Sequence, residues 1–310
     1  MNCTPFCANR SRSIFIYLHS HWNRAQLSVR SLISFRKSFI LLSAFFLGII
    51  PAVAQNASSA ERSPETIALI QRVLAASGGN ASIGAIHDVV ATGTISPPMA
   101  SKETAESAAT ALTISMRGLD QLRVDSVLPA GKRSLFFNRG ALSSKEKDGA
   151  IIPRGSEDAV SSTSHFFPWA HLAAALQDTS YSVTAPEPLT DAETGANLYH
   201  FRLCRSRSDT IGSAHRTTSS VTVDYYVDAT TNYIVRVKNL HRDRGVMPPD
   251  NGRGPYDVYS FSDYGLEQGL LLPHQIVVSL DKRMVFTIKI TTYELNTGLA
   301  ESAFVPSSQQ

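Results

Sequence analysis

Histidine is the side chain best suited to metal binding or proton transfer, and two histidines flank the most aromatic segment of the chain. His165 and His171 lie on either side of Phe166-Phe167-Pro168-Trp169. Two histidines that share one helix face and one metal ion stand four residues apart, and these two do not. The other histidines beyond the N-terminal segment are scattered along the chain, at His87, His200, His215, His241 and His274. We therefore expect isolated histidines that lie on the surface or are hydrogen-bonded, with no metal site and no cofactor.

Serines and carboxylates do not form a recognisable catalytic group either. A hydrolase serine stands in a sharp G-x-S-x-G turn that exposes its oxygen, and the chain has no such segment. Acidic residues are spread along predicted loops, turns and strand ends: Glu187, Asp191, Glu193, Asp224, Asp228 and the segment Gly155-Ser156-Glu157-Asp158, which we expect to lead into a central helix. The sequence thus predicts a protein that is not an enzyme. The alternative, a hydrolase of an unrecognised kind, requires ionisable groups gathered in a cleft.

The N-terminal segment has the pattern of a secretory signal. The basic pair Arg36-Lys37 precedes an apolar run from Phe39 to Ile50, which ends in Pro51-Ala52-Val53-Ala54. Signal peptidase accepts small side chains at the positions that Ala52 and Ala54 occupy. We predict that residues 1–54 are a targeting segment cleaved near Ala54, which places the protein in the periplasm or cell envelope. An uncleaved anchor is the alternative, and the true translation start is predicted near Val29.

Loss of this segment changes the charge and the cysteine content. The chain has 29 basic and 26 acidic residues, but residues 1–54 hold six of the basic and none of the acidic ones, so the rest carries a net charge of −3. Without a basic patch, nucleic acid is not an expected partner. Cys204 is the one cysteine left, and we expect it to be a small packed side chain rather than a reactive thiol.

The remaining chain is patterned mainly as strands. A helix is predicted from Ser63-Pro64-Glu65, with serine as N-cap, to Ser77-Gly78-Gly79. Apolar and polar residues then alternate with a period of two, which is typical of an antiparallel sheet with one solvated face. The predicted strands centre on His87–Ile95, Leu112–Met116, Leu122–Ser126, Tyr199–Leu203, Val221–Val227, Tyr233–Lys238, Tyr256–Tyr264, Gln275–Leu280 and Met284–Glu294. The polar segments 205–220 and 242–255 are predicted to be surface loops at the rim of the sheet.

One helix is predicted in the middle of the chain, beginning at Pro168. Trp169, Leu172, Ala173 and Leu176 recur at helical spacing. The apolar face of this helix must lie against the sheet or inside whatever the sheet encloses.

The later segments and the order of elements resemble a known family. The segments are Tyr225 to Ile234, Val258 to Tyr264 with Gly269 to Pro273, Tyr293 to Asn296, and Phe304 to Pro306. Together they resemble the LolA/LolB-like periplasmic lipoprotein-carrier superfamily. The resemblance implies a mainly β fold: a curled antiparallel sheet or half-open β-barrel, with an N-terminal helix and a central helix on its concave face, which holds acyl chains. It covers residues 63–306 as a single β domain, after a flexible start at residues 55–62 and before a tail at residues 307–310.

Two functions remain open at this point. In the first, the protein binds an apolar ligand, a lipid or a lipoprotein acyl chain, and five apolar residues line or cover the site: Phe166, Phe167, Trp169, Leu172 and Leu176. The same five residues could instead fill the barrel as core. In the second, the protein is an envelope scaffold or interaction module that binds a protein partner through a sheet edge and the rim loops.

Overall fold

The computed structural model describes residues 62–97, 109–128, 131–156, 163, 165–211, 214–240, 256–280 and 283–307. They belong to one compact unit. The predicted signal segment, its cleavage site and the polar segment 242–255 lie outside the described residues.

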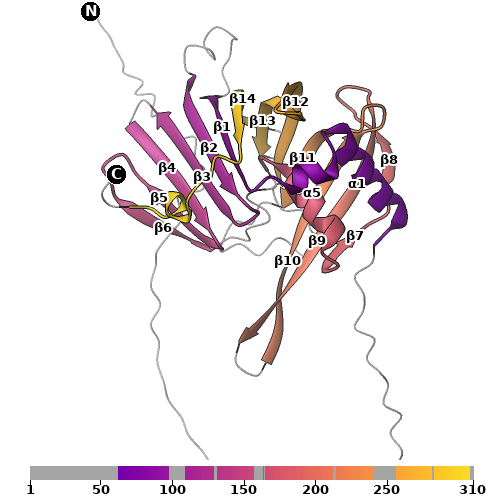
Figure 1. The fold of residues 1–310 in the computed structure, drawn as a ribbon, viewed down its shortest axis with the longest axis horizontal. Helices are drawn as coiled ribbons and strands as arrows, with labels where there is room; N and C mark the ends of the chain where they lie inside the picture. The colour runs from indigo at the N-terminus through magenta and orange to yellow at the C-terminus, as the bar shows by residue number, and fades with distance from the viewer. Residues whose placement is uncertain are drawn as a thin grey trace, which may run out of the picture. The chain divides into compact units, whose positions relative to one another are not determined.

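Helices and strands follow the order shown in Figure 1. The elements are α1 (Pro64–Ala76), α2 (Asn80–Gly84), β1 (Asp88–Ser96), β2 (Thr110–Arg117), β3 (Gln121–Leu128), β4 (Gly131–Asn138), β5 (Ala141–Lys145), β6 (Ile151–Ser156), α5 (Pro168–Gln177), β7 (Tyr181–Val183), β8 (Glu187–Thr190), β9 (Asn197–Ile211), β10 (Ala214–Asp228), β11 (Ile234–Leu240), β12 (Tyr256–Glu267), β13 (Leu270–Leu280), β14 (Arg283–Leu295) and the 3-10 helix η2 (Glu301–Phe304).

The described strands form a single antiparallel sheet. Its order is β6-β5-β4-β3-β2-β1-β14-β13-β12-β11-β10-β9-β7, and β8 also pairs with β9. We call β1 to β6 the first half of the sheet and the remaining strands, from β14 to β7 in this order, the second half. Strand β1 joins the two halves, because it pairs with β2 on one side and with β14 on the other. The two ends of the order, β6 and β7, do not pair, so the sheet is open. The predicted mainly β fold with an open, curled antiparallel sheet is confirmed.

Helix α1 forms as its sequence predicts. The Ser63 hydroxyl accepts a hydrogen bond from the Thr66 backbone N–H at 3.3 Å, and Pro64 occupies the first turn, where its missing N–H costs nothing. The buried side of the helix is mostly apolar, with Leu69, Ile70, Val73 and Leu74 beside the buried Thr66. The chain leaves the helix at Gly78, whose φ of 117° suits glycine.

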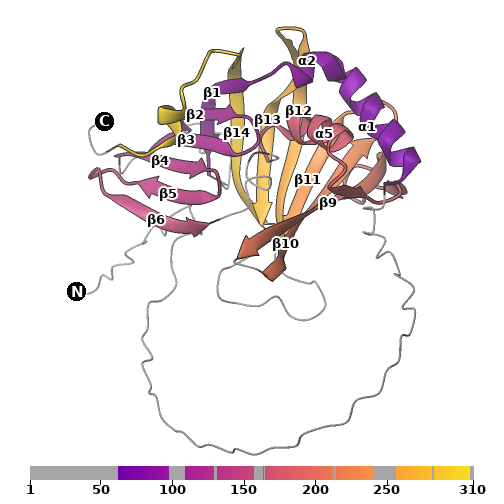
Figure 2. The ribbon, with the colours of Figure 1, turned by 60° about the horizontal axis from the view of Figure 1, so that its bottom comes forward.

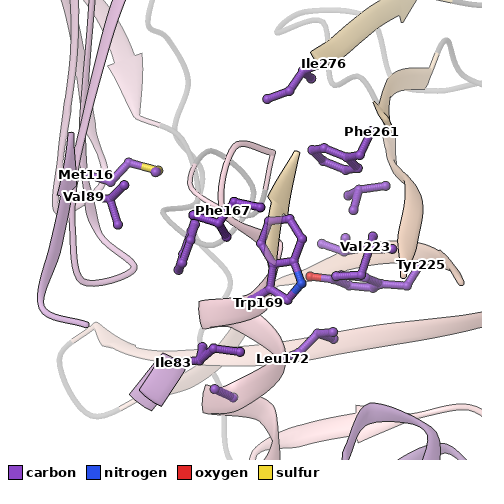
Figure 3. Close-up of a cluster of buried hydrophobic side chains, with 14 of the residues drawn as sticks. Ile83, Val89, Met116, Phe167, Trp169, Leu172, Val223, Tyr225, Phe261 and Ile276 are labelled. Carbon is purple, nitrogen blue, oxygen red and sulfur yellow. The ribbon is translucent and has the colours of Figure 1, made fainter. Parts of the chain in front are cut away.

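Both halves of the sheet turn an apolar face toward α5. Val89 and Met116 from β1 and β2 point at the helix from one side, and Val223, Tyr225 and Phe261 from β10 and β12 point at it from the other (Figure 3). All of these side chains belong to one buried cluster with Trp169 and Leu172 of the helix. The sheet thus curls around α5, as Figure 2 shows from a second direction. We call the face toward α5 the inner face and the opposite one the outer face.

Several predicted loops are strands in the structure. The segment 205–220, predicted to be a rim loop, is mostly paired: β9 runs to Ile211 and β10 starts at Ala214, so the two form a long ribbon beyond the rest of the sheet (Figure 1). Glu187 lies in β8 rather than in a loop. Gly155 and Ser156 end β6, and Glu157 and Asp158, the rest of the segment expected to lead into the central helix, lie outside the described residues. These segments are strands because their backbones pair with neighbouring strands, and the composition of the residues does not predict this pairing.

Candidate functional site

Helix α5 is held at its N-terminal end by a turn of the sheet. Thr163 donates a hydrogen bond from its hydroxyl to the Leu119 carbonyl at 2.8 Å, and its own carbonyl accepts from the backbone N–H of Phe166 and Phe167. Leu119 belongs to the turn that joins β2 to β3. The start of the helix is therefore fixed next to the first half of the sheet.

The other end of α5 is held by Arg62. Its guanidinium donates to the backbone carbonyls of Ala175 and Asp178, both at 2.8 Å. Ala175 lies in the last turn of the helix and Asp178 is its C-cap residue, so neither carbonyl has a partner within the helix. A cation at this end also interacts favourably with the helix dipole. Arg62 ends the segment expected to be a flexible start, so the described chain begins with a residue that positions the central helix.

The five residues predicted to line or cover a ligand site do not share one environment. Trp169 and Leu172 are fully buried, and Phe167 is buried as well. The Trp169 ring contacts Phe261 and Tyr264 edge-on, with centroid distances of 6.1 and 6.3 Å. Phe166 and Leu176 are half-buried at the margin of the cluster. Trp169 and Leu172 thus pack as core between helix and sheet.

A pocket of about 190 Å³ lies on another side of α5, against α2 and the start of β1. Of the five predicted residues, only Phe167 lines it. The helix contributes three small side chains to the wall, Ala170, Ala173 and Ala174. Gln177, at the end of α5, also lines the pocket. The remaining wall comes from α2 and the segment that follows it, β1, β2, the β2–β3 turn and Thr163, namely Ile83, Gly84, Ile86, His87, Asp88, Val89, Met116, Gly118, Leu119 and Thr163. Most of these side chains are apolar.

The one carboxylate in the pocket wall is already occupied. The Asp88 oxygens accept hydrogen bonds from the hydroxyl and backbone N–H of Thr297 and from the N–H groups of Gly298 and Leu299, at 2.7 to 3.3 Å. Burial by itself raises the pKa of Asp88, but these donors outweigh it and lower the pKa below its ordinary value. Asp88 thus fixes the chain after β14 to the start of β1 and offers no free base to the pocket.

The buried polar groups of α5 lie away from this pocket. His171 Nδ1 is 2.6 Å from the Tyr225 hydroxyl, and burial, with Arg205 and His165 nearby, lowers the pKa of His171 to about 3. His171 Nε2 and Trp169 Nε1 are buried and have no hydrogen-bond partner among the described residues. Both imidazole and phenol are therefore neutral, which suits a packed interior and not acid–base catalysis at neutral pH.

His165 also lies in a packed environment. Its ring stacks on Tyr259 with centroids 4.2 Å apart, and its Nε2 contacts the Asn239 side chain. Burial lowers the pKa of His165 to about 4, although Asp257 opposes the shift. No cluster of three metal-ligating residues occurs in the part of the chain that the structure describes. Cys204 is half-buried, with its sulfur 3.3 Å from the Thr222 hydroxyl oxygen.

The pocket was not predicted from the sequence. Residues that line it, such as Ile83, Met116 and Ala174, come from three elements that only the fold brings together. The one local signal is the run of alanines in α5, which leaves space on one side of an otherwise bulky helix. None of the helices in the described residues has the length and apolar character needed to cross a bilayer.

The structure is similar to solved structures that include the LolA superfamily. A DUF1329 family protein from Desulfovibrio piger is 12% identical, with a TM-score of 0.46, over 80% of this chain and 100% of its own. A LolA superfamily protein from Nitrosomonas europaea is 13% identical, with a TM-score of 0.42, over 76% of this chain and 97% of its own. No protein-family model and no curated protein matches the chain. At these identities and TM-scores the likeness concerns the fold, and the function must be argued from the pocket.

Proposed function

We propose that the protein is an exported, non-catalytic binding protein of the periplasm or cell envelope that holds an acyl chain of a lipid or lipoprotein beside α5. The observation that carries this proposal is the pocket between α5, α2 and β1. A concave site with mostly apolar walls and few polar groups is the usual form of a small-molecule site. The signal pattern before Ala54 supports the proposed location.

The size of the pocket limits what it holds. Sites for drug-sized ligands measure about 300–1,000 Å³, while an apolar cavity of about 150 Å³ is enough for benzene. A pocket of about 190 Å³ therefore suits the end of one acyl chain and is too small for a whole two-chain lipid. We expect fatty acids and single-chain lipids to bind more tightly than two-chain phospholipids.

The alanines of α5 give the sharpest test. In the double variant Ala170→Leu/Ala174→Leu, two larger side chains fill the space next to Phe167. The matched control is Ala75→Leu, which makes the same change at an exposed position of α1. Binding of radiolabelled palmitate and of a lysophospholipid is measured by equilibrium dialysis for each protein.

The proposal requires that the unsubstituted protein and Ala75→Leu bind palmitate and that the filled variant binds at least about tenfold more weakly, a loss of about 1.4 kcal/mol. Circular dichroism must show that the filled variant is still folded. Native mass spectrometry of protein purified from its own envelope should also find a single-chain lipid bound. Equal binding by a folded filled variant, or no palmitate binding at all, would disprove an acyl-chain site here.

The alternative, a scaffold that pairs its sheet edge with a partner, receives less support from the structure. At one end of the strand order, β6 is short and contains Pro153, which cannot donate a backbone hydrogen bond. At the other end, β7 has three residues, and β8, with Pro188, has four. These features protect edges against added strands. The remaining open edge is the ribbon of β9 and β10 beyond Arg205 and Val223, where the structure describes no neighbouring strand.

A further inference from the structure

A second pocket, of about 170 Å³, lies on the outer face of the first half of the sheet. Side chains that pair across neighbouring strands share a face: Arg123 pairs with Phe136, Val127 with Lys132, and Ser134 with Lys145. Leu122 and Val124, which alternate with Arg123, belong to the core side of β3. The pocket is lined by Arg123, Lys132, Ser134, Phe136, Lys145, Glu146, Lys147, Gly149 and Ser307.

The C-terminal segment forms one wall of this pocket. Phe304 is fully buried, and Arg123 donates a hydrogen bond to the Ala303 carbonyl at 3.2 Å. Lys145 donates to the Ser307 carbonyl at 2.9 Å. The segment is thus fixed against β3–β5 by basic side chains, and the wall is part of the fold.

The opposite wall forms where the start of β4 closely approaches the β5–β6 turn. A Cβ added at Gly131, the first residue of β4, would lie 2.8 Å from the Cβ of Lys147, so glycine is needed at this approach. The φ of Gly131, 119°, also favours glycine. The approach brings Lys147 of the turn near Lys132, the second residue of β4.

Three acidic residues lie near the pocket, and each has a partner. Asp125 lies 2.8 Å from Arg123 Nε, and Glu146 lies 2.9 Å from the Arg133 guanidinium. Asp148, between Lys147 and Gly149 in the chain, accepts a hydrogen bond from the Ala150 backbone N–H at 3.0 Å. Together with Lys132, Lys145 and Lys147, these charged residues have a net charge of +2. Neither the Lys132 side chain nor the Lys147 side chain makes a hydrogen bond or an ion pair within the described residues.

We propose that this pocket binds a phosphate group. Three lysines and an arginine that line one small hollow favour a compact anion of high charge, and lysine binds phosphate as a point charge. A phospholipid headgroup and a phosphate free in solution offer the same chemistry. Two apolar side chains on the same face are exposed, Val127 beside Lys132 and Ile151 beside Lys145, so a membrane surface must be included in the test.

The test variant is Lys132→Gln/Lys147→Gln in the full chain. Both lysines are exposed, so the fold should survive, which circular dichroism and the melting temperature check. The matched control is Arg283→Gln/Lys289→Gln, which removes the same charge from exposed positions of β14. Inorganic phosphate and glycerol phosphate are titrated by calorimetry at constant ionic strength. Sedimentation with vesicles of phosphatidylcholine, with and without phosphatidylglycerol, gives the membrane arm.

We expect the unsubstituted protein and the control to bind phosphate. The pocket variant should bind phosphate at least about tenfold more weakly, because it lacks two charge-assisted donors. If the protein sediments with phosphatidylglycerol vesicles and free phosphate reverses this sedimentation, the ligand is a lipid headgroup. If the protein binds phosphate in solution but does not sediment with the vesicles, the ligand is a free phosphate. If the protein binds neither phosphate nor these vesicles, or if pocket variant and control lose equal affinity, the pocket is not a phosphate site. This outcome is independent of palmitate binding at α5.

Discussion

The Nδ1 atom of His171 lies 2.6 Å from the Tyr225 hydroxyl, in a contact that joins the central helix to strand β10 in the interior. Burial raises the pKa of Tyr225 well above its ordinary value and lowers that of His171, so both groups are neutral in the folded protein. The helix is thus attached to the sheet by a buried polar contact between two neutral groups, and charging the histidine is costly because its ring is buried.

Acid should therefore destabilise the protein well above the pH at which its carboxylates titrate. The folded pKa of His171, about 3, lies below the unfolded value of about 6.5. Neutral His171 therefore makes its full contribution to the free energy of unfolding above pH 6.5, and this contribution is lost as the pH falls below 6.5. Between pH 6.5 and 5 we expect a loss of about 2 kcal/mol from this residue. Urea denaturation across this range should show a shallower pH dependence for His171→Gln, and an unchanged slope would contradict the assignment.

A second histidine should act in the opposite direction. His200 Nε2 lies 3.0 Å from Asp224, whose hydrogen bond raises the pKa of His200 above its ordinary value although partial burial opposes this. A raised folded pKa gives stability that is present below pH 6.5 and is lost as the pH rises through the folded value. From pH 6 to 8 the unsubstituted protein should lose stability relative to His200→Gln. The prediction fails if the two proteins keep the same difference in unfolding free energy at both pH values.

Replacement of Trp169 should mainly cost stability. Its ring is fully buried among Phe167, Phe261 and Tyr264, so Trp169→Ala should lower the free energy of unfolding by about 3–5 kcal/mol, and Trp169→Phe by less. Denaturation followed by circular dichroism measures both. A loss below about 1 kcal/mol for the alanine variant would show that the ring is not core.

The fluorescence of Trp169 offers a related measurement. In a Trp22→Phe chain, Trp169 is the remaining tryptophan. Its emission should be that of a buried indole and should change when palmitate is added, because Phe167 contacts the ring and also lines the α5 pocket. Emission that no fatty acid changes would favour a role without a ligand at α5.

A glycine substitution tests the junction between the two halves of the sheet. A Cβ at Gly93 of β1 would lie 2.0 Å from the Lys289 carbonyl oxygen of β14, at a register shift between these strands. Gly93→Ala should cost about 1–3 kcal/mol, because the backbones must move apart. Gly84→Ala is the control, since a Cβ there meets nothing within 4 Å. Equal stability of the two variants would show that β1 and β14 can move apart at Gly93 without a measurable loss of stability.

The sequence predicted the strands that have one solvated face and missed strands that do not alternate. In β4, Leu135, Phe136 and Phe137 are consecutive and apolar because the core covers Phe137 on the inner face, while Phe136 lies on the outer face beside the C-terminal segment. A strand covered on both faces loses the period of two. The ribbon formed by residues 205–211 and 214–220 was missed for the opposite reason, since its polar composition gives no apolar alternation to read.

The candidate site was predicted only in part. Helical spacing identified α5 and its apolar residues, and Trp169 and Leu172 are indeed the ones that pack against the sheet. The pocket instead depends on the alanines of the same helix and on contacts with Ile83 and Met116, which are distant in sequence. Such contacts follow from the curl of the sheet, and no local pattern records them. The basic pocket is similar, because it needs Ser307 beside Lys145.

The position of β1 between β2 and β14 also sets the order in which the chain can fold. Val89 pairs with Met116, which follows soon after it, and with Leu295, near the end of the chain. The ribosome and the translocation pore both release a chain from its N-terminus. One edge of β1 therefore stays unpaired until β14, the last strand, has been released. Pairings of such long sequence separation form slowly, and an open edge recruits other chains while it waits. A product truncated before Arg283 would retain β1 to β13 but lack β14, the strand that connects β1 to β13 and so to the second half of the sheet, and aggregation is the expected fate of such incomplete chains.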